Sequence, residues 1–371
     1  MAVIVNDMSE VNIDAALIEN GGAELSRTEE TLVEMSNGCI CCTLRDDLLK
    51  EVSRLAKENR FDYLLIESTG VSEPLPVAQT FTFVDEEGRS LQELTKLDTM
   101  VTVVDGKNFL KDYRSQEDLK DRDMAIAPAD DRGLGDLLVE QVEFADILVI
   151  SKVDLIDKDA LHEVTGVLKA LNPDAEIVLS NNADIPIDKV LGTKRFDLDK
   201  AMRSATWLKE LNNEHVPETE EYGISNFTFR ARRPFHPDRL FKYLNCDEWK
   251  KIIRSKGYVW IATRNEHGCL WSQAGTSCRL EPAGKWIAAV PEEEWPVEDE
   301  AGKEELRKQL VGEYGDRRQE FVVIGQNINK EKIHFELEAC LLNDEELAMG
   351  SKLWAQNFKD PFPQWQFEIT S

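Results

Sequence analysis

Ile147–Asp154 has the sequence ILVISKVD, in which four apolar residues are followed by serine, lysine, valine and aspartate. A short continuous apolar run is typical of a strand that is buried on both faces in a parallel sheet. Four other stretches have the same character, namely Ala2–Val5, Tyr63–Ile66, Met100–Val104 and Glu176–Leu179. We therefore expect all of them to be parallel strands, with polar or acidic residues gathered where they end.

The segments between these strands carry helical patterns. Apolar residues recur at helical spacing over Leu134–Val142, and again over Leu161–Leu171, which is followed by Pro173. Alternation of strands and helices predicts a doubly wound α/β sheet. Ligands of such sheets bind at the carboxyl ends of the strands, which is where the polar residues lie here.

The S-K-V-D run at Ser151–Asp154 differs by one serine from the N-K-x-D signature with which GTPases bind guanine. In that loop the aspartate accepts hydrogen bonds from the N1 and exocyclic amino groups of guanine, and the lysine stem lies over the base. The match predicts Lys152 and Asp154 as guanine-binding residues, with Ser180 adding a backbone contact one strand later. The alternative is a solvated turn without a ligand.

Glu67 ends another predicted strand and begins the run Glu67–Gly70, with the sequence ESTG. An acid at this place in P-loop proteins holds the Mg²⁺ shell and senses the γ-phosphate. The alternative is an acid that caps the following turn. A phosphate cradle also needs G-x-x-x-x-G-K-[ST], and the printed sequence contains no such Walker A loop.

Three of the seven cysteines lie within four residues, in Asn37–Thr43 with the sequence NGCICCT. Apolar residues at helical spacing follow over Leu44–Leu55, so Cys39, Cys41 and Cys42 are expected just before a helix N-terminus. The helix dipole favours thiolates there, and thiolates bind metals such as zinc. Three thiolates leave one tetrahedral position open, which suits a transfer site. Buried core cysteines and a thioredoxin-like redox pair are the alternatives.

Length, charge and cysteine usage bound the class of protein. The 371 residues have room for two ordinary domains. A net charge of -27 disfavours nucleic acid as a partner, because an acidic surface repels phosphate backbones. No apolar run reaches the roughly 20 residues of a membrane helix, and Met1–Asp7 does not resemble a signal peptide. We therefore expect a cytoplasmic protein with no membrane partner and reduced cysteines.

The pattern changes after a polar segment that is typical of a linker. We divide the chain into a first domain (1–206), a linker (207–221), a second domain (222–342) and a C-terminal tail (343–371) that is packed on the body or free. The second domain is expected to be α+β. Its predicted strands are Ile224–Phe229, Tyr258–Ile261, Leu270–Gln273, Trp286–Ala289 and Phe321–Ile324, its helices are Pro237–Leu244 and Lys330–Leu342, and Pro291–Glu305 is predicted to be an acidic loop.

Taken in chain order, these motifs resemble the CobW family of GTP-dependent metallochaperones. The likeness rests on Asn6–Asp14, Asn37–Cys42, Glu67–Gly70 and Ser151–Asp154. Glu220–Ser225 and Arg233–Pro237 resemble the start of the family's C-terminal domain, and Arg254–Gly257 resembles a motif within that domain. The likeness spans nearly the whole chain and is nearest to the zinc-responsive bacterial members.

The resemblance implies a P-loop GTPase-like, mostly parallel sheet followed by a smaller α+β domain. It implies a protein that couples its nucleotide state to the delivery of zinc, or another divalent transition metal, to client metalloproteins. By position, Cys39, Cys41 and Cys42 would be metal ligands, with Glu10 as a candidate carboxylate partner. Nucleotide that ordered the loop around Glu10 would change the fourth ligand.

The same resemblance implies GTP with Mg²⁺ as cofactor. Glu67 would belong to the segment that holds Mg²⁺ and senses the γ-phosphate, and Lys152 and Asp154 would read guanine. Ser151 departs from the family's asparagine, which removes an amide that braces the loop. We therefore expect a reduced affinity for guanine.

Family members also carry a strand, a Walker A loop and its helix before the segment that matches Ala2–Asp7. We expect a truncated form, a misplaced start codon or a naturally shortened paralogue. Such a chain should hydrolyse GTP poorly or not at all and should have an uncovered strand edge. The alternative to a GTP-dependent metallochaperone is a zinc-binding or client-docking module that works without nucleotide.

Overall fold

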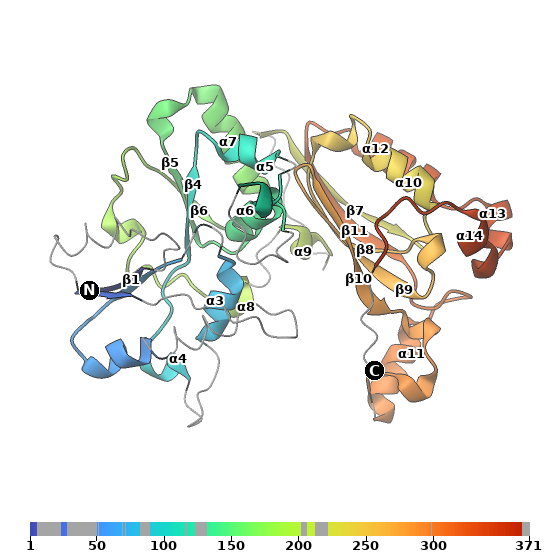
Figure 1. Cartoon of the computed structure of the whole chain (residues 1–371), viewed down its shortest axis with the longest axis horizontal. Helices are drawn as coiled ribbons and strands as arrows, with labels where there is room; N and C mark the ends of the chain where they lie inside the picture. The colour runs from blue at the N-terminus through green and yellow to red at the C-terminus, as the bar shows by residue number, and fades with distance from the viewer. Residues whose placement is uncertain are drawn as a thin grey trace.

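Two bodies of different architecture lie side by side in the computed structural model of the chain (Figure 1). The structure describes residues 1–5, 24–27, 50, 52–68, 70, 72–81, 90–115, 117–122, 132–201, 206–211, 222–297 and 299–365. The first body, at the left of Figure 1, has parallel strands between helices, and the second is built on an antiparallel sheet. The predicted order of a parallel α/β part and then an α+β part is confirmed.

The described strands of the first body form two sheets of three parallel strands, where we expected one doubly wound sheet. One sheet has the order β2-β1-β3 and consists of β1 Ala2–Val5, β2 Glu24–Arg27 and β3 Leu64–Glu67. The other has the order β4-β5-β6 and consists of β4 Val101–Asp105, β5 Ile147–Ser151 and β6 Glu176–Leu179.

Open strand edges follow from this division. Among the described residues, β3 and β4 each have a neighbouring strand on one side only. Val103, in the middle of β4, is 68% exposed, although β5 beside it is buried from Ile147 to Ile150.

Helix α7, Lys158–Leu171, shows how the sequence positions the helices of the first body. The Asp157 carboxylate caps it by accepting a hydrogen bond from the Ala160 amide at 2.8 Å. Asn172 follows the helix and is fully buried. Its side-chain amide donates to the carbonyl oxygens of Val142 and Ala145 at 2.9 and 2.8 Å. These bonds tie the end of α7 to the end of α6, Leu134–Glu143.

Shorter helices complete the first body. They are α3 Pro74–Thr80, α4 Leu91–Leu94, α5 Phe109–Tyr113 and α8 Leu198–Ala201, with the 3-10 turns η1 Leu119–Arg122, η2 Val153–Leu155 and η3 Ile187–Lys189. Helix α9 Thr206–Leu211 follows and packs mainly on the antiparallel sheet of the second body.

The second body is organised on an antiparallel sheet with the strand order β10-β9-β8-β11-β7. Its strands are β7 Ile224–Ala231, β8 Ile252–Val259, β9 His267–Ala274, β10 Ser277–Lys285 and β11 Gln319–Gln326. Gly257 in β8 has φ +148, and a Cβ there would lie 2.3 Å from the Glu320 carbonyl oxygen in β11. The glycine of Arg254–Gly257 is therefore required by the close approach of two strands.

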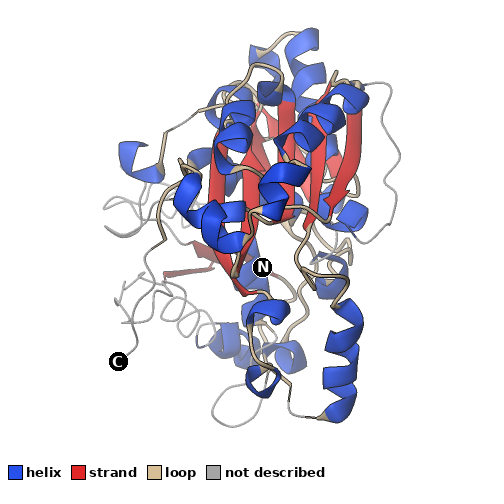
Figure 2. Ribbon diagram, turned by 90° about the vertical axis from the view of Figure 1, so that its right-hand side faces the viewer, coloured by secondary structure: helices blue, strands red, loops and turns tan. Residues whose placement is uncertain are grey.

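Both faces of this sheet are covered. Helices α10 Pro237–Leu244 and α12 Lys330–Cys340 lie on the outer face, in front of the sheet in Figure 2. The inner face packs on the first body, and one hydrophobic core joins Leu148 and Val167 to Val322 and Ile324. Phe321 and Val323 point to the outer core instead, as the alternation of side chains along a strand requires. The two bodies thus share a core.

Three details of the second body differ from the prediction. Trp286–Ala289 is not a strand, because Ile287–Ala289 forms the 3-10 turn η7 after β10. The predicted acidic loop at Pro291–Glu305 contains η8 Glu292–Glu294 and the start of helix α11 Glu300–Gln309. Strand β8 ends at Val259, before Trp260 and Ile261. The remaining elements are the 3-10 turns η5 Trp249–Lys251 and η6 Ala262–Arg264 and the helices α13 Asp344–Ala348 and α14 Ser351–Asn357.

None of the helices in the described ranges combines the length and the apolar character that crossing a membrane requires.

Candidate nucleotide and metal site

The carboxyl ends of β4, β5 and β6 carry the polar residues that the sequence singles out. Asp105 lies opposite Ser151 in the parallel register of β4 and β5, and Ser180 follows β6 directly. The Ser180 amide donates to the Ile150 carbonyl at 2.8 Å. Three neighbouring strands therefore bring an acid and two hydroxyls to one edge of the sheet.

Asp105 is the centre of this edge. The Lys152 ammonium donates to its carboxylate at 2.8 Å, as does the side-chain amide of Asn108. The backbone amides of Lys107 and Asn108 donate to the other oxygen at 3.0 and 3.1 Å. Burial alone would raise the pKa of Asp105, but these hydrogen bonds, led by that of Lys152, lower it. Asp105 is therefore an ionised partner for Lys152. In the sequence, the only indication of this site residue was that the strand β4 ends in an acid.

The loop after β5 has an unusual backbone. Lys152 is in the left-handed region, with φ 57 and ψ 33, before the 3-10 turn η2. The Ser151 hydroxyl donates to the Val104 carbonyl at 3.0 Å, so it braces β4. A Cβ at Gly106 would lie 2.7 Å from the Ser151 carbonyl oxygen, which explains the glycine after Asp105. The side chains of Lys152 and Asp154 are both exposed.

Ser180 is placed beside this loop. Its carbonyl accepts from the Val153 amide at 3.5 Å, and only 1% of the residue is exposed. Its hydroxyl has no hydrogen-bond partner among the described residues. A buried hydroxyl without a partner costs about 1–3 kcal/mol. The structure brings Lys152, Asp154 and Ser180 into one cluster.

Glu67 ends β3, in the other parallel sheet, and its side chain is exposed. Glu10, Cys39, Cys41 and Cys42 lie outside the described residues, so their predicted roles stay predictions. Within the described ranges, no group of three or more His, Cys, Asp or Glu side chains could hold a metal ion.

The four described cysteines are free thiols. Burial raises the pKa of Cys269 to about 12 and that of Cys340 to about 11. Both are therefore protonated at neutral pH, and a protonated thiol is a poor ligand for zinc.

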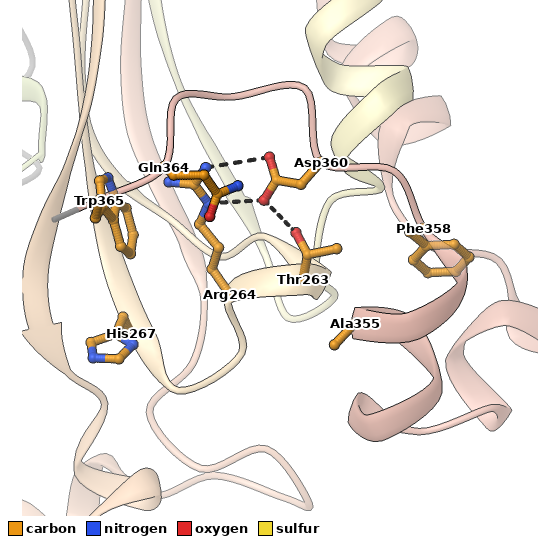
Figure 3. Close-up of a pocket in the computed structure, with 8 residues that line it drawn as sticks. All are labelled: Thr263, Arg264, His267, Ala355, Phe358, Asp360, Gln364 and Trp365. Carbon is orange, nitrogen blue, oxygen red and sulfur yellow. Dashed lines mark hydrogen bonds and ion pairs between the residues drawn. The ribbon is translucent and has the colours of Figure 1, made fainter. Parts of the chain in front are cut away.

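A cavity of about 440 Å³ lies in the second body, lined by Arg264, His267, Phe358 and Trp365 among others (Figure 3). Arg264 donates to the Asp360 carboxylate at 2.9 Å, and its guanidinium lies 4.3 Å from the centre of the Trp365 ring. These contacts hold the segment around Asp360 and Trp365 on the second body. The C-terminal tail was expected to be either packed on the body or free, and this part of it is packed. None of the predicted site residues lines the cavity.

Two families match most of the chain. Residues 1–179 match the one described as CobW/HypB/UreG, nucleotide-binding domain. Residues 224–341 match the one described as Cobalamin synthesis protein cobW C-terminal domain.

Individual relatives point the same way. The chain is 47% identical over 364 residues to Zinc-regulated GTPase metalloprotein activator 1 of Dictyostelium discoideum. The aligned region covers 95% of this chain and 76% of that protein. It is 27% identical over 375 residues to Zinc chaperone Rv0106 of Mycobacterium tuberculosis. That alignment covers 96% of this chain and 86% of the other protein. Among solved structures, Zn(II)-bound YjiA GTPase from E. coli aligns at 19% identity and a TM-score of 0.36, over 92% of this chain and 91% of that one.

Proposed function

This chain belongs to the CobW family, and from that premise we propose that it is a GTP-dependent metallochaperone that delivers zinc to client metalloproteins. The observation that carries the proposal is the cluster at the ends of β4, β5 and β6, where the S-K-V-D loop lies beside Ser180 and is joined to Asp105 by Lys152. The names of two relatives, a zinc-regulated activator and a zinc chaperone, support zinc as the cargo.

The cluster offers what guanine needs. The exposed Asp154 carboxylate is an acceptor for the N1 and amino groups of the base, and adenine presents the wrong edge to it. Lys152 has a stem that can cover the base while its ammonium stays on Asp105. The backbone at Ser180, one strand later, would supply a further contact to the base. We therefore assign Lys152, Asp154 and Ser180 to guanine recognition.

The remaining assignments extend the same proposal. We assign Glu67 to the Mg²⁺ shell of GTP, in a P-loop GTPase-like arrangement of the parallel strands. Cys39, Cys41 and Cys42 would hold the zinc cargo as thiolates, with Glu10 as a further ligand. We keep the domain boundaries at 1–206, 207–221, 222–342 and 343–371, and the cytoplasm as the location. Because the printed sequence has no Walker A motif, we propose that residues 1–371 hydrolyse GTP poorly.

Replacing Asp154 with asparagine tests the guanine site. We expect the preference for a fluorescent GTP analogue over the matching ATP analogue to fall about tenfold or more, because a hydrogen bond to a charged group contributes roughly 1.5–3 kcal/mol. Equilibrium fluorescence titration of the full chain measures it. The control is Asp159→Asn, an exposed aspartate in the first turn of α7, which should leave the ratio unchanged. An unaltered ratio in Asp154→Asn would contradict the assignment.

Replacing Cys41 with serine tests the metal site. We expect the affinity for zinc to fall at least about tenfold, because a thiolate ligand is lost. Competition between the chain and a chromophoric chelator measures the affinity, with Cys246→Ser in the second body as the matched control. If both variants bind zinc as the unaltered chain does, the cysteine run is not the site. If the unaltered chain does not bind GTP but binds zinc, and Cys41→Ser abolishes the zinc binding, the result favours the alternative of a zinc-binding module that works without nucleotide.

A further inference from the structure

Contacts at both ends of β3 join the sheet β2-β1-β3 to the sheet β4-β5-β6. Beyond the carboxyl end, the side-chain amide of Gln141 in α6 donates to the carbonyl oxygens of Gly70 and Ser72 at 2.9 and 3.1 Å. The Gln141 carbonyl oxygen accepts from the Thr102 hydroxyl of β4 at 2.7 Å, so this contact reaches the second of the two sheets. The contact at the amino end of β3 is made by Asp98.

Asp98 lies where the chain crosses from one sheet to the other. Leu97, just before it, packs against the hydrophobic core that contains Ile4 of β1 and Leu91. Met100, two residues after it, is joined to the other sheet, because its carbonyl oxygen accepts from the Ile147 amide at 3.1 Å. The crossing is therefore confined to the residues around Asp98.

The carboxylate of Asp98 holds both sides of this crossing. It accepts from the Tyr63 hydroxyl at 2.6 Å, and the Tyr63 carbonyl oxygen accepts from the Ala2 amide of β1 at 2.9 Å. It also accepts from the backbone amides of Thr193 and Lys194 at 3.0 and 2.8 Å. These two residues belong to the segment that follows β6 and η3. Separate segments that flank the two sheets thus meet at one carboxylate.

Charge strengthens this junction. Burial raises the pKa of Asp98, but hydrogen bonds, led by that of Tyr63, lower it to about 2. The Thr99 hydroxyl donates to the same carboxylate at 2.7 Å and lies 2.6 Å from the Thr193 hydroxyl. An ionised acceptor forms shorter and stronger hydrogen bonds than a neutral one. Asp98 therefore holds its donors more firmly than a neutral side chain would.

The proposed nucleotide site is divided between the two sheets that Asp98 joins. Glu67, assigned to Mg²⁺, ends β3, whereas Lys152 and Asp154, assigned to guanine, follow β5. One nucleotide can contact both groups only if the sheets keep one orientation. Contacts at a single end of β3 would leave the strand free to pivot about them. Contacts at both ends fix its direction, and with it the direction in which Glu67 leaves the strand.

Resting on the proposed GTPase function, we propose that Asp98 is a positioning residue of the nucleotide site. It fixes the direction of β3 relative to β5, so that Glu67 and the guanine-binding loop face the same nucleotide. Asp98 acts through Tyr63 and the segment after β6, at the amino ends of β3 and β4. The groups that it positions lie at the carboxyl ends of the strands.

A distance measured between the two sheets tests the proposal without nucleotide. Nitroxides on unnatural amino acids at Lys57 and Asp159, which are both exposed, leave the cysteines unmodified. Lys57 follows Leu55, which packs in the core of the first sheet, and Asp159 lies on α7, which packs on the other. Double electron–electron resonance on the full chain should give a distance distribution about twice as wide in Asp98→Ala, because the hydrogen-bonded network loses its acceptor.

Two further variants make the measurement specific. Tyr63→Phe removes only the bond to the first sheet and should broaden the distribution less than Asp98→Ala. The matched control is Asp146→Ala, because Asp146 accepts from the Met100 amide at 2.8 Å and so acts within one sheet. Equal broadening in the control, or no broadening in Asp98→Ala, would overturn the proposal. If Asp98→Ala does not fold, an unchanged distribution in Tyr63→Phe would refute it.

Nucleotide binding separates positioning from a general loss of structure. Mg²⁺ should raise the affinity of the unaltered chain for a fluorescent GTP analogue. In Asp98→Ala this gain should fall at least about threefold, because a metal ligand must be held to a fraction of an ångström. The preference for the GTP analogue over the ATP analogue should stay, since the guanine-binding loop lies in one sheet.

The outcomes of the two measurements differ for the two proposals. Loss of both the Mg²⁺ gain and the preference for guanine in Asp98→Ala would show general damage and overturn the positioning role, as would an unchanged Mg²⁺ gain. An unaltered chain that binds no nucleotide would refute the proposed function instead. The distance distribution would then still decide whether Asp98 fixes the orientation of the sheets.

Discussion

Replacing Arg254 with methionine is expected to destabilise the folded chain by about 3–5 kcal/mol, because it removes the guanidinium from a buried carboxylate. Glu143 is 2% exposed and loses both hydrogen bonds from the guanidinium. The Ser272 hydroxyl and the Gln273 carbonyl, each 3.1 Å from Arg254, lose a donor as well. The pair joins the two bodies, so the loss falls on the contact between them.

Urea unfolding followed by circular dichroism measures this change. Arg230→Met is the matched control, because Arg230 is a strand arginine whose side chain is 43% exposed and pairs with Glu320. Its loss should cost less than about 1 kcal/mol. The double variant Arg254→Met with Glu143→Leu should regain most of the stability, since no unpaired charge remains. A double variant as unstable as the single one would show that the ion pair is not the cause.

The second large effect is a change in how stability depends on pH when Glu140 becomes glutamine. The pKa of Glu140 is about 7 in the folded chain, raised by burial from the ordinary value of 4.5. Between these values the folded chain holds a proton that the unfolded chain has released, so rising pH lowers the free energy of unfolding. Glutamine has no such proton, and at pH 8 the variant should be more stable by roughly 2–3 kcal/mol.

Unfolding in urea at several pH values from 5 to 8 checks this prediction. The difference between the unaltered chain and Glu140→Gln isolates this carboxyl from all other titrating groups. It should be smallest at pH 5 and grow until about pH 8. Glu93→Gln, at an exposed position of α4, should give a difference that does not vary with pH. Parallel curves for Glu140→Gln would contradict the raised pKa of this carboxyl group.

The apolar strands of the first body could be predicted from sequence, although β3, β4 and β6 are less buried than predicted, and two exposed elements could not be predicted. The apolar run of β5 is buried at every position from Ile147 to Ile150, so its burial is reflected directly in its composition. Strand β10 is mostly exposed, and helix α11 has no buried residue, so neither carries an apolar pattern. Segment Ser277–Lys285 is a strand because it forms hydrogen bonds with β9. These bonds exist only in the folded chain, so they leave no pattern in the sequence.

The candidate site divides in the same way. Lys152 and Asp154 stand in a recognisable four-residue run, and Ser180 was found from the order of the strands. The pairing of Lys152 with Asp105 joins residues 47 positions apart, and that of Arg254 with Glu143 joins residues 111 apart. No local pattern predicts contacts of that range, because they arise only when separate elements pack together.

The shared core has a consequence for anyone who dissects this protein. Val322 and Ile324 of the antiparallel sheet are fully buried in the same cluster as Leu148 and Val167 of the parallel part. A fragment cut near residue 222 would expose that inner surface to water and would aggregate. The two family matches thus mark segments of shared ancestry, whereas we expect both segments to melt in a single cooperative transition.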